Sequence, residues 1–137
     1  IMVDTFETAT NWNHIDEQMQ QMQEAVRTSL ADEGEEVMAF THISHVYKQG
    51  ASLYTTYFFR AAKDHASTLS RWQKIKHAAS LSLANGTATI SHQHGVGRDH
   101  APYLAAEKGK LGIQVTHDML KSLDPEQRMN PGVLIKE

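Results

Sequence analysis

Residues 37–60 read VMAFTHISHVYKQGASLYTTYFFR, and this stretch decides the fold. A run from Val37 to Tyr47 is followed by the turn Lys48-Gln49-Gly50. A second run, Ser52 to Arg60, is rich in Thr, Tyr and Phe. Two such runs around a short turn that contains glycine predict a β-hairpin.

Side chains along the second run alternate between two faces, because successive residues of a strand point to opposite sides. One face carries Leu53, Thr55, Tyr57 and Phe59, and the other carries Tyr54, Thr56 and Phe58. Both faces are partly apolar. We therefore expect packing on both sides of the sheet, with the last helix or a neighbouring domain covering the second side.

An amphipathic helix is predicted upstream of the hairpin, and a short strand, Val3 to Thr8, precedes it. The apolar positions of this helix recur every three or four residues: Trp12, Ile15, Met19, Met22, Val26 and Leu30. Thr10 or Asn11 can cap its start, and Gly34 stands where a glycine ends a helix.

Downstream of the hairpin, the pattern predicts a second helix, a strand and a third helix. The second helix carries Leu69, Trp72, Ile75, Ala79 and Leu83 and ends at Asn85-Gly86. The strand is Thr87 to Ser91. The third helix starts around Pro102, carries Leu104, Leu111, Val115, Met119 and Leu123, and stops at Asp124-Pro125, before an irregular tail.

The resulting order of elements is strand, helix, strand, strand, helix, strand. This order predicts an α+β fold, a ferredoxin-like antiparallel sheet with both helices on one face, extended by a C-terminal helix and an irregular tail. Residues 1–97 make up the ferredoxin-like core, and residues 98–137 make up the added helix and tail.

Composition excludes several classes of function. The chain has 137 residues, a formal net charge of -3 and no cysteine, so thiol chemistry and cysteine-bound metals are excluded. No cluster of basic charge points to nucleic acid. No run approaches the roughly 20 apolar residues of a membrane span, and no targeting signal is visible, so we expect a cytoplasmic protein if the source is bacterial. The first residue, Ile1, leads us to expect a piece of a longer protein.

The candidate chemistry lies around His92-Gln93-His94-Gly95-Val96-Gly97. An extended backbone would point His92 and His94 to the same side. Together with His42 or His45 they can bind a transition metal, or they can simply donate hydrogen bonds to a ligand, and both interpretations remain open. The glycines do not fit a dinucleotide-binding loop, because His100 stands at the third glycine position.

Two further residue types qualify for the site. Tyr54 and Tyr57 point to opposite faces of their strand, so at most one shares a site with the histidines. Arg98 and Lys48 are the cations suited to an anionic group.

Three motifs, taken together, resemble a known family. They are Tyr47 to Tyr54, Gly86 with Ser91 to Gly97, and Asp124-Pro125 with Asn130-Pro131-Gly132. In this order and spacing they resemble the C-terminal region of FAD-linked oxidases of the vanillyl-alcohol-oxidase type, and within that group the alkyldihydroxyacetonephosphate synthase family. The resemblance covers about the last two-thirds of the chain.

The resemblance implies most of a substrate (cap) domain, with residues 98–137 packing toward an FAD-binding domain of the same parent chain. It implies FAD as the cofactor of the parent, Tyr54 as the acid/base, and His92 and His94 as groups that stabilise charge near the flavin. Gln93, Gly95, Gly97 and Asn130 are implied at the cofactor, and no metal is implied. Arg98 is expected at the substrate because its charge suits an anionic group. Gln93 replaces the middle histidine of the family's run of three, and an amide cannot titrate.

The implied reaction replaces the acyl group of acyl-dihydroxyacetone phosphate by a long-chain alcohol, through a flavin adduct. A small molecule or a lipid phosphate is therefore the expected substrate, and the isolated chain is expected to bind no FAD and to be inactive. We expect no nucleic-acid partner, contact with a membrane surface only in the parent, and self-association as a homo-oligomer.

Two alternatives stay open. One is an FAD-dependent oxidase or dehydrogenase of a 2-hydroxy acid, from a branch of the same superfamily that typically carries a metal motif on the hairpin. His45 fits its first ligand, but Tyr54 stands at the second and Gln93 at an acidic position. The other alternative is a ferredoxin-like binding module without catalysis.

Overall fold

The predicted hairpin forms the centre and one edge of a three-stranded sheet. In the computed structural model, which describes residues 1–135, β2 (Met38–Val46) and β3 (Gly50–Phe59) pair antiparallel. The other edge of β3 pairs antiparallel with β1 (Met2–Asn11), so the strand order is β1-β3-β2. The α+β antiparallel fold is confirmed, and the first strand is longer than predicted.

Gly50 allows this pairing to reach the end of β1. A Cβ atom at Gly50 would stand 1.9 Å from the carbonyl oxygen of Thr10, which no side chain tolerates. The absence of a side chain therefore lets the two backbones approach closely at the start of β3.

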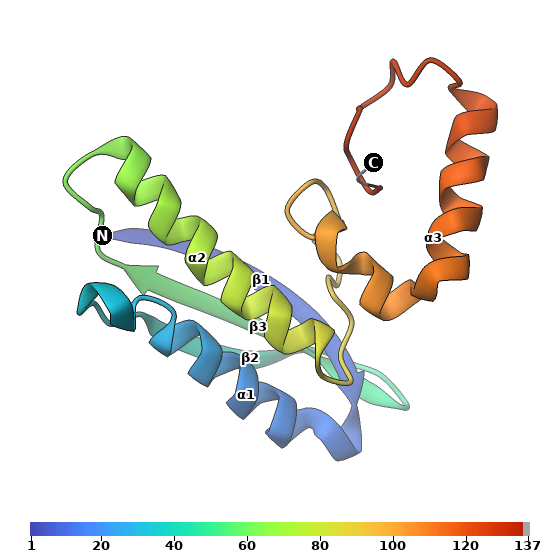
Figure 1. The fold of residues 1–137 in the computed structure, drawn as a ribbon. Coiled ribbons are helices and arrows are strands. Elements are labelled where there is room, and N and C mark those ends of the chain that lie inside the picture. The colour runs from blue at the N-terminus through green and yellow to red at the C-terminus, as the bar shows by residue number, and fades with distance from the viewer. Residues whose placement is uncertain (136–137) are drawn as a thin grey trace.

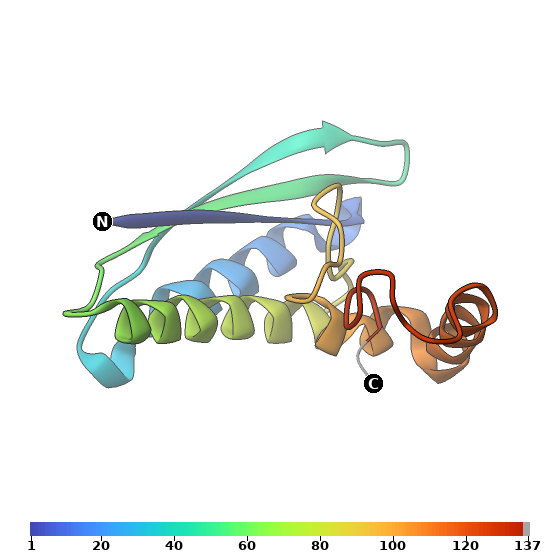
Figure 2. The same cartoon turned by 90° about the horizontal axis from the view of Figure 1, so that it is seen from above.

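The two predicted helices cover one face of the sheet. The first consists of η1 (Trp12–His14) and α1 (Ile15–Thr28), and it is followed by η2 (Ala31–Glu33). The second is α2 (His65–Ala84). Figure 2 shows both α-helices beneath the sheet. The core between these layers includes Phe6, Met22, Val26, Leu30, Leu53, Tyr57, Phe59, Ile75, Ala79 and Leu83.

The predicted helix ends need small corrections. Neither Thr10 nor Asn11 caps α1, because β1 continues to Asn11, whose side chain makes no capping bond. Gly34 does end the helical segment, in the left-handed conformation at φ 67°, but after the 3₁₀ turn η2. Asp64 caps α2 by accepting a hydrogen bond from Ser67 N–H.

The predicted fourth strand, Thr87 to Ser91, does not form a regular strand. The segment does follow the free edge of β1: Thr89 N–H donates to the Ala9 carbonyl and His92 N–H to the Glu7 carbonyl, both at 2.9 Å. These donors lie three residues apart, whereas the N–H groups along one edge of a strand recur every two residues. Between them, Ile90 N–H points away from β1 and donates to the Glu107 carboxylate of α3 at 2.8 Å.

The third helix does not cover the second face of the sheet, the one opposite α1 and α2. It begins with η3 (Ala101–Tyr103), which contains Pro102, and continues as α3 (Leu104–Leu123). A break at Gly109, with φ 68° and ψ 168°, turns α3 away from the sheet (Figure 1). Of its predicted apolar stripe, Leu104 is buried, whereas the part after the break is exposed, 77% at Leu111 and 80% at Leu123. Of the two covers expected for the second sheet face, the last helix is therefore excluded.

No helix within residues 1–135 is long and apolar enough to cross a bilayer.

Asp4 joins the strands to α2 on the covered face. Its carboxylate accepts hydrogen bonds from Trp72 Nε1 at 2.7 Å and Tyr57 Oη at 3.0 Å, and it lies 3.2 Å from Lys76 Nζ. Burial by itself would raise the pKa of Asp4, but these hydrogen bonds, the Thr5 N–H and the charge of Lys76 outweigh it and hold the pKa below its ordinary value. Burial and the nearby carboxylate raise the pKa of Tyr57.

We expect Asp4→Asn to destabilise the chain in a pH-dependent way. Since the pKa of Asp4 is lower in the folded than in the unfolded chain, the carboxylate stabilises the fold fully above about pH 4 and less as the pH falls. At pH 7 the variant should lose roughly 1–3 kcal/mol of unfolding free energy. The difference from the wild type should narrow below about pH 4. Urea unfolding at pH 7 and pH 3 measures this, and a constant difference would contradict it.

Candidate functional site

One row of side chains crosses the open face of the sheet. Glu7 on β1 and His42 on β2 lie directly opposite Tyr54 on β3, so the three side chains share a face. The rings of His42 and Tyr54 stack, with centroids 5.3 Å apart at 26°. Tyr54 Oη donates to Thr5 Oγ1 at 3.3 Å. Tyr57 lies on the covered face, so the predicted alternation of the two tyrosines is confirmed.

A bulge in β2 adds two polar residues to this row. The pairing register shifts between Ile43 and Val46, so Ser44 and His45 both stand beside Ser52. Ser44 Oγ lies 2.6 Å from Ser52 Oγ, and His45 N–H donates to Ser52 Oγ at 2.9 Å. Bulges often aim side chains at functional sites, and this one brings the hydroxyl and the imidazole next to Glu7.

The loop after α2 brings the two predicted histidines to the same face. Figure 2 shows it rising past β1 to the level of the sheet. The ring of His94 meets the Tyr54 ring edge-on, with centroids 5.3 Å apart at 77°. His92 Nε2 lies 2.8 Å from Tyr47 Oη. We name the set Glu7, His42, Ser44, His45, Tyr47, Ser52, Tyr54, His92 and His94 the outer-face site.

The histidines reach this face by a turn and not by the extended backbone that we expected. Gln93, at φ 58°, and Gly95, at φ 70°, are both left-handed. His94 N–H donates to the His92 carbonyl at 2.8 Å, and Ser91 Oγ to the Gly95 carbonyl. This tight turn separates the histidines, so that His92 meets Tyr47 and His94 meets Tyr54.

Glu7 is the buried charge of the outer-face site, with only 3% of its surface exposed. One carboxylate oxygen accepts from Ser44 Oγ and lies 3.3 Å from His45 Nδ1, and the other lies 3.5 Å from His94 Nε2. Burial would raise the pKa of Glu7, but hydrogen bonds from Ser44, Ser52 and His45 and the charge of His94 lower it below its ordinary value. Glu7 is therefore ionised at neutral pH.

The other predicted site residues lie apart from this row. Gln93 is exposed at the tip of the turn. Gly95 and Gly97, both left-handed, have open space where a side chain would be. Arg98 donates to the Pro131 carbonyl at 3.1 Å, so its guanidinium lies against the C-terminal tail.

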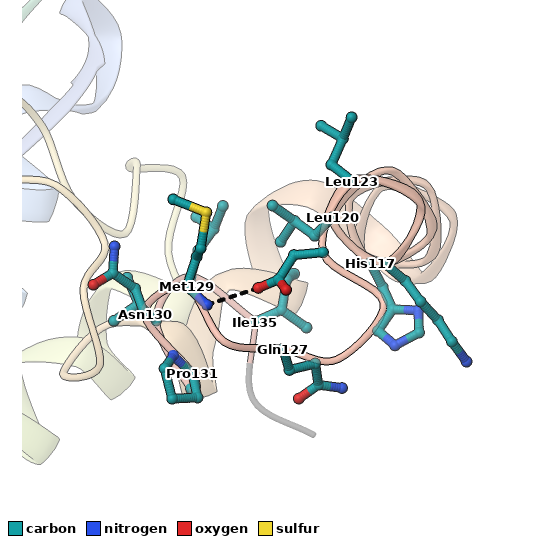
Figure 3. A pocket seen from close by; sticks show the side chains of 13 residues that line it. His117, Leu120, Leu123, Gln127, Met129, Asn130, Pro131 and Ile135 are labelled. Carbon is teal, nitrogen blue, oxygen red and sulfur yellow. Dashed lines mark hydrogen bonds between the residues drawn. The ribbon is translucent and has the colours of Figure 1, made fainter.

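Asn130 belongs to a separate hollow of about 390 Å³ between the second half of α3 and the tail. Figure 3 shows its lining, in which Leu120, Leu123 and Met129 are apolar, and the hydrogen bond by which Met129 N–H donates to the Asp124 carboxylate at 2.7 Å. This hollow contains no residue of the outer-face site.

Sequence reasoning missed Glu7 and Tyr47 as site residues. The available signal was a carboxylate inside a strand of Thr, Phe and Ala, where charged residues are uncommon. The sequence points to His42 and His45 as metal ligands alone. Within residues 1–135, no group of three or more histidine or acidic side chains is arranged to hold a metal ion.

Comparison with known proteins matches residues 1–134 to the family of FAD linked oxidases, C-terminal domain. Alkyldihydroxyacetonephosphate synthase of Trypanosoma brucei brucei is 25% identical over 132 residues, which is 96% of this chain and 21% of the relative. The enzyme of the same name from Dictyostelium discoideum is 24% identical over 133 residues, 97% of this chain and 21% of the relative. A mitochondrial D-lactate dehydrogenase (cytochrome) of Arabidopsis thaliana is 35% identical over 63 residues, 46% of this chain and 11% of the relative.

Solved structures agree on the fold. Two crystal forms of alkyldihydroxyacetonephosphate synthase match 94% of this chain, with TM-scores of 0.53 and 0.55 at 18% and 17% identity, and the matches cover 20% and 19% of those chains. The chain spans about a fifth of the length of the relatives it matches. It belongs to the FAD-linked oxidases and corresponds to the C-terminal domain of that family.

Proposed function

We propose that the full-length protein exchanges the acyl group of acyl-dihydroxyacetone phosphate for a long-chain alcohol. The ether C–O bond forms to the alcohol oxygen, the C–O bond to the acyloxy group breaks, and a fatty acid leaves. The observation that carries this proposal is the similarity to alkyldihydroxyacetonephosphate synthases along 96% and 97% of the chain. The outer-face site supplies a phenol and imidazoles suited to it.

FAD is the cofactor that the family implies for the full-length protein. The turn at Gly95 and Gly97 fits a large planar group beside it, because no atom of residues 1–135 lies within 4 Å of where either side chain would be. His92 and His94 offer ring N–H donors next to this open space. When bound, FAD supplies a ring that accepts and returns an electron pair beside the substrate.

In this proposal, residues of the chain itself transfer the proton, stabilise charge and bind the phosphate. Tyr54 takes and returns the proton at the substrate, because its hydroxyl donates to the neutral acceptor Thr5 Oγ1 and not to a carboxylate. His92 and His94 stabilise negative charge as it develops, and Gln93 contributes hydrogen bonds alone. Arg98 binds the substrate phosphate: a guanidinium has five N–H donors, and the bond to Pro131 uses one.

The exposed apolar surfaces support docking onto the FAD-binding domain of the same chain. On the sheet, Phe40 is 57% exposed and meets Phe58 edge-on, beside the outer-face site. On α3, the stripe from Leu111 to Leu123 is exposed as well. Isolated domains rarely expose apolar patches of this kind without a partner. In the proposal, residues 98–137, with Asn130, cover the cofactor side of that domain.

A second candidate function is oxidation of a 2-hydroxy acid. The match to the Arabidopsis D-lactate dehydrogenase, at 35% identity over 46% of the chain, favours it. That similarity covers less of the chain than the similarity to the synthases.

The two functions predict different reactions of the purified full-length protein. For the exchange reaction, we expect radiolabelled hexadecanol to enter the ether product with release of fatty acid, in the absence of any electron acceptor. Reduction of a dye by D-lactate, without incorporation of the alcohol, would favour the second function instead.

Tyr54→Phe in the full-length protein should reduce turnover by about 100-fold or more, the usual contribution of a general acid or base. The flavin absorbance should stay, because the removed hydroxyl has Thr5 as its one hydrogen-bond partner within residues 1–135. Tyr57→Phe is the matched control on the other face of β3 and should act through stability alone. Wild-type turnover in Tyr54→Phe would remove Tyr54 from the mechanism.

The 137-residue chain by itself should form no stable complex with FAD. Its glycine turn lies before the short 3₁₀ helix η3, and the dinucleotide-binding pattern is missing a glycine at His100. Titration of FAD into the purified chain, followed by flavin fluorescence, measures this. A protein that stays yellow after gel filtration would contradict the expectation.

A further inference from the structure

Glu7 has an unusual environment for a charge on an open sheet face. The carboxylate is 3% exposed, while its neighbours across the outer-face site, His45 and His94, keep 47% and 29% of their side-chain surface exposed. A buried carboxylate destabilises a fold unless partners compensate for its lost hydration. A threonine or valine at this strand position would avoid that cost, so Glu7 requires an explanation beyond packing.

The contacts of Glu7 connect three separate segments of the site. Oε1 meets Ser44 and His45 on the β2 bulge, and Oε2 meets His94 on the loop after α2. The backbone carbonyl of the same residue accepts His92 N–H at 2.9 Å. Glu7 therefore holds the loop by its backbone at His92 and by its side chain at His94.

The contact to His94 decides where that ring stands relative to Tyr54. His94 is the loop residue whose ring meets Tyr54, edge-on at 5.3 Å, and Glu7 pairs with Tyr54 across the β1–β3 ladder. Carboxylate, imidazole and phenol ring thus form a compact triangle. Without an acceptor at Oε2, the turn at Gln93 and Gly95 leaves the His94 ring free to rotate.

We propose that Glu7 is a positioning residue that acts through His94, holding the imidazole against Tyr54 while its other oxygen orders His45. The catalytic side of this assignment rests on the proposed function. An ionised carboxylate can accept from both sides at once, whereas a glutamine has a single acceptor oxygen and presents an NH₂ donor on the other side.

The kinetic test is a double-mutant cycle in the full-length protein. We expect Glu7→Gln to lower kcat for the exchange reaction about tenfold or more, with a small change in KM, because the contact orients a group without touching the substrate. His94→Gln should lower kcat at least as much. Adding Glu7→Gln to His94→Gln should cause no further loss.

Asp4→Asn is the matched control, since it removes a carboxylate from the same strand on the opposite face. We expect the loss of kcat in the double variant of Asp4→Asn and His94→Gln, measured per flavin-bearing protein, to equal the product of the losses in the two single variants. If the loss of kcat in the double variant of Glu7→Gln and His94→Gln equals the product of the two single losses, the assignment is overturned and Glu7 has a purely structural role.

A crystal structure of the full-length Glu7→Gln protein separates this proposal from the proposed function, since it needs no substrate. We expect the His94 ring to leave Tyr54 or to take several conformers, with β1 in place and with His94 unchanged in Asp4→Asn. A His94 ring that stays on Tyr54 in Glu7→Gln would overturn the assignment. Absence of alcohol exchange in the wild type would overturn the proposed function alone.

Discussion

The two-residue period of β3 is the constraint on which the rest of the structure depends. Because neighbours along a strand point to opposite sides, Leu53, Tyr57 and Phe59 enter the core and Tyr54 faces outward. A shift of register by one residue would exchange the two sets and remove both the core and the outer-face site. Gly50 protects this register, because no other residue fits against Thr10 where β3 begins.

The two faces use carboxylates from the same strand in different ways. Asp4 points into the helix layer and is satisfied by Trp72, Tyr57 and Lys76, so it joins sheet to helix. Glu7 points outward and is satisfied by side chains of the site. In both cases hydrogen bonds compensate for lost hydration, which is why the pKa values of both carboxyls lie below their ordinary values although burial opposes this.

Much of the fold was predictable, because local patterns determine it. The hairpin, α1 and α2 follow from alternation and from the helical spacing of apolar residues. The fourth strand was wrong because the two-residue repeat breaks after Thr89: His92, and not Ser91, donates the next hydrogen bond to β1, while Ile90 N–H is bonded to Glu107 of α3. The break of α3 at Gly109 was missed too, since a single glycine within a helical pattern is usually tolerated.

The sequence by itself determined the antiparallel sheet and the two covering helices, since the pattern that forms each strand or helix lies within a few neighbouring positions. It also pointed to Tyr54, His92 and His94 as residues of the site. Only the tertiary structure decided which groups meet there. Glu7, Tyr47 and Tyr54 are brought to the histidine turn by contacts between segments far apart in the sequence, as in the bond from His92 N–H to the Glu7 carbonyl, 85 residues away. Arg98 and Asn130 lie instead at the C-terminal tail, where Arg98 donates to the Pro131 carbonyl and Asn130 lines the hollow beside α3. Contacts between distant segments follow from packing of the whole chain, and no local pattern of residues encodes them.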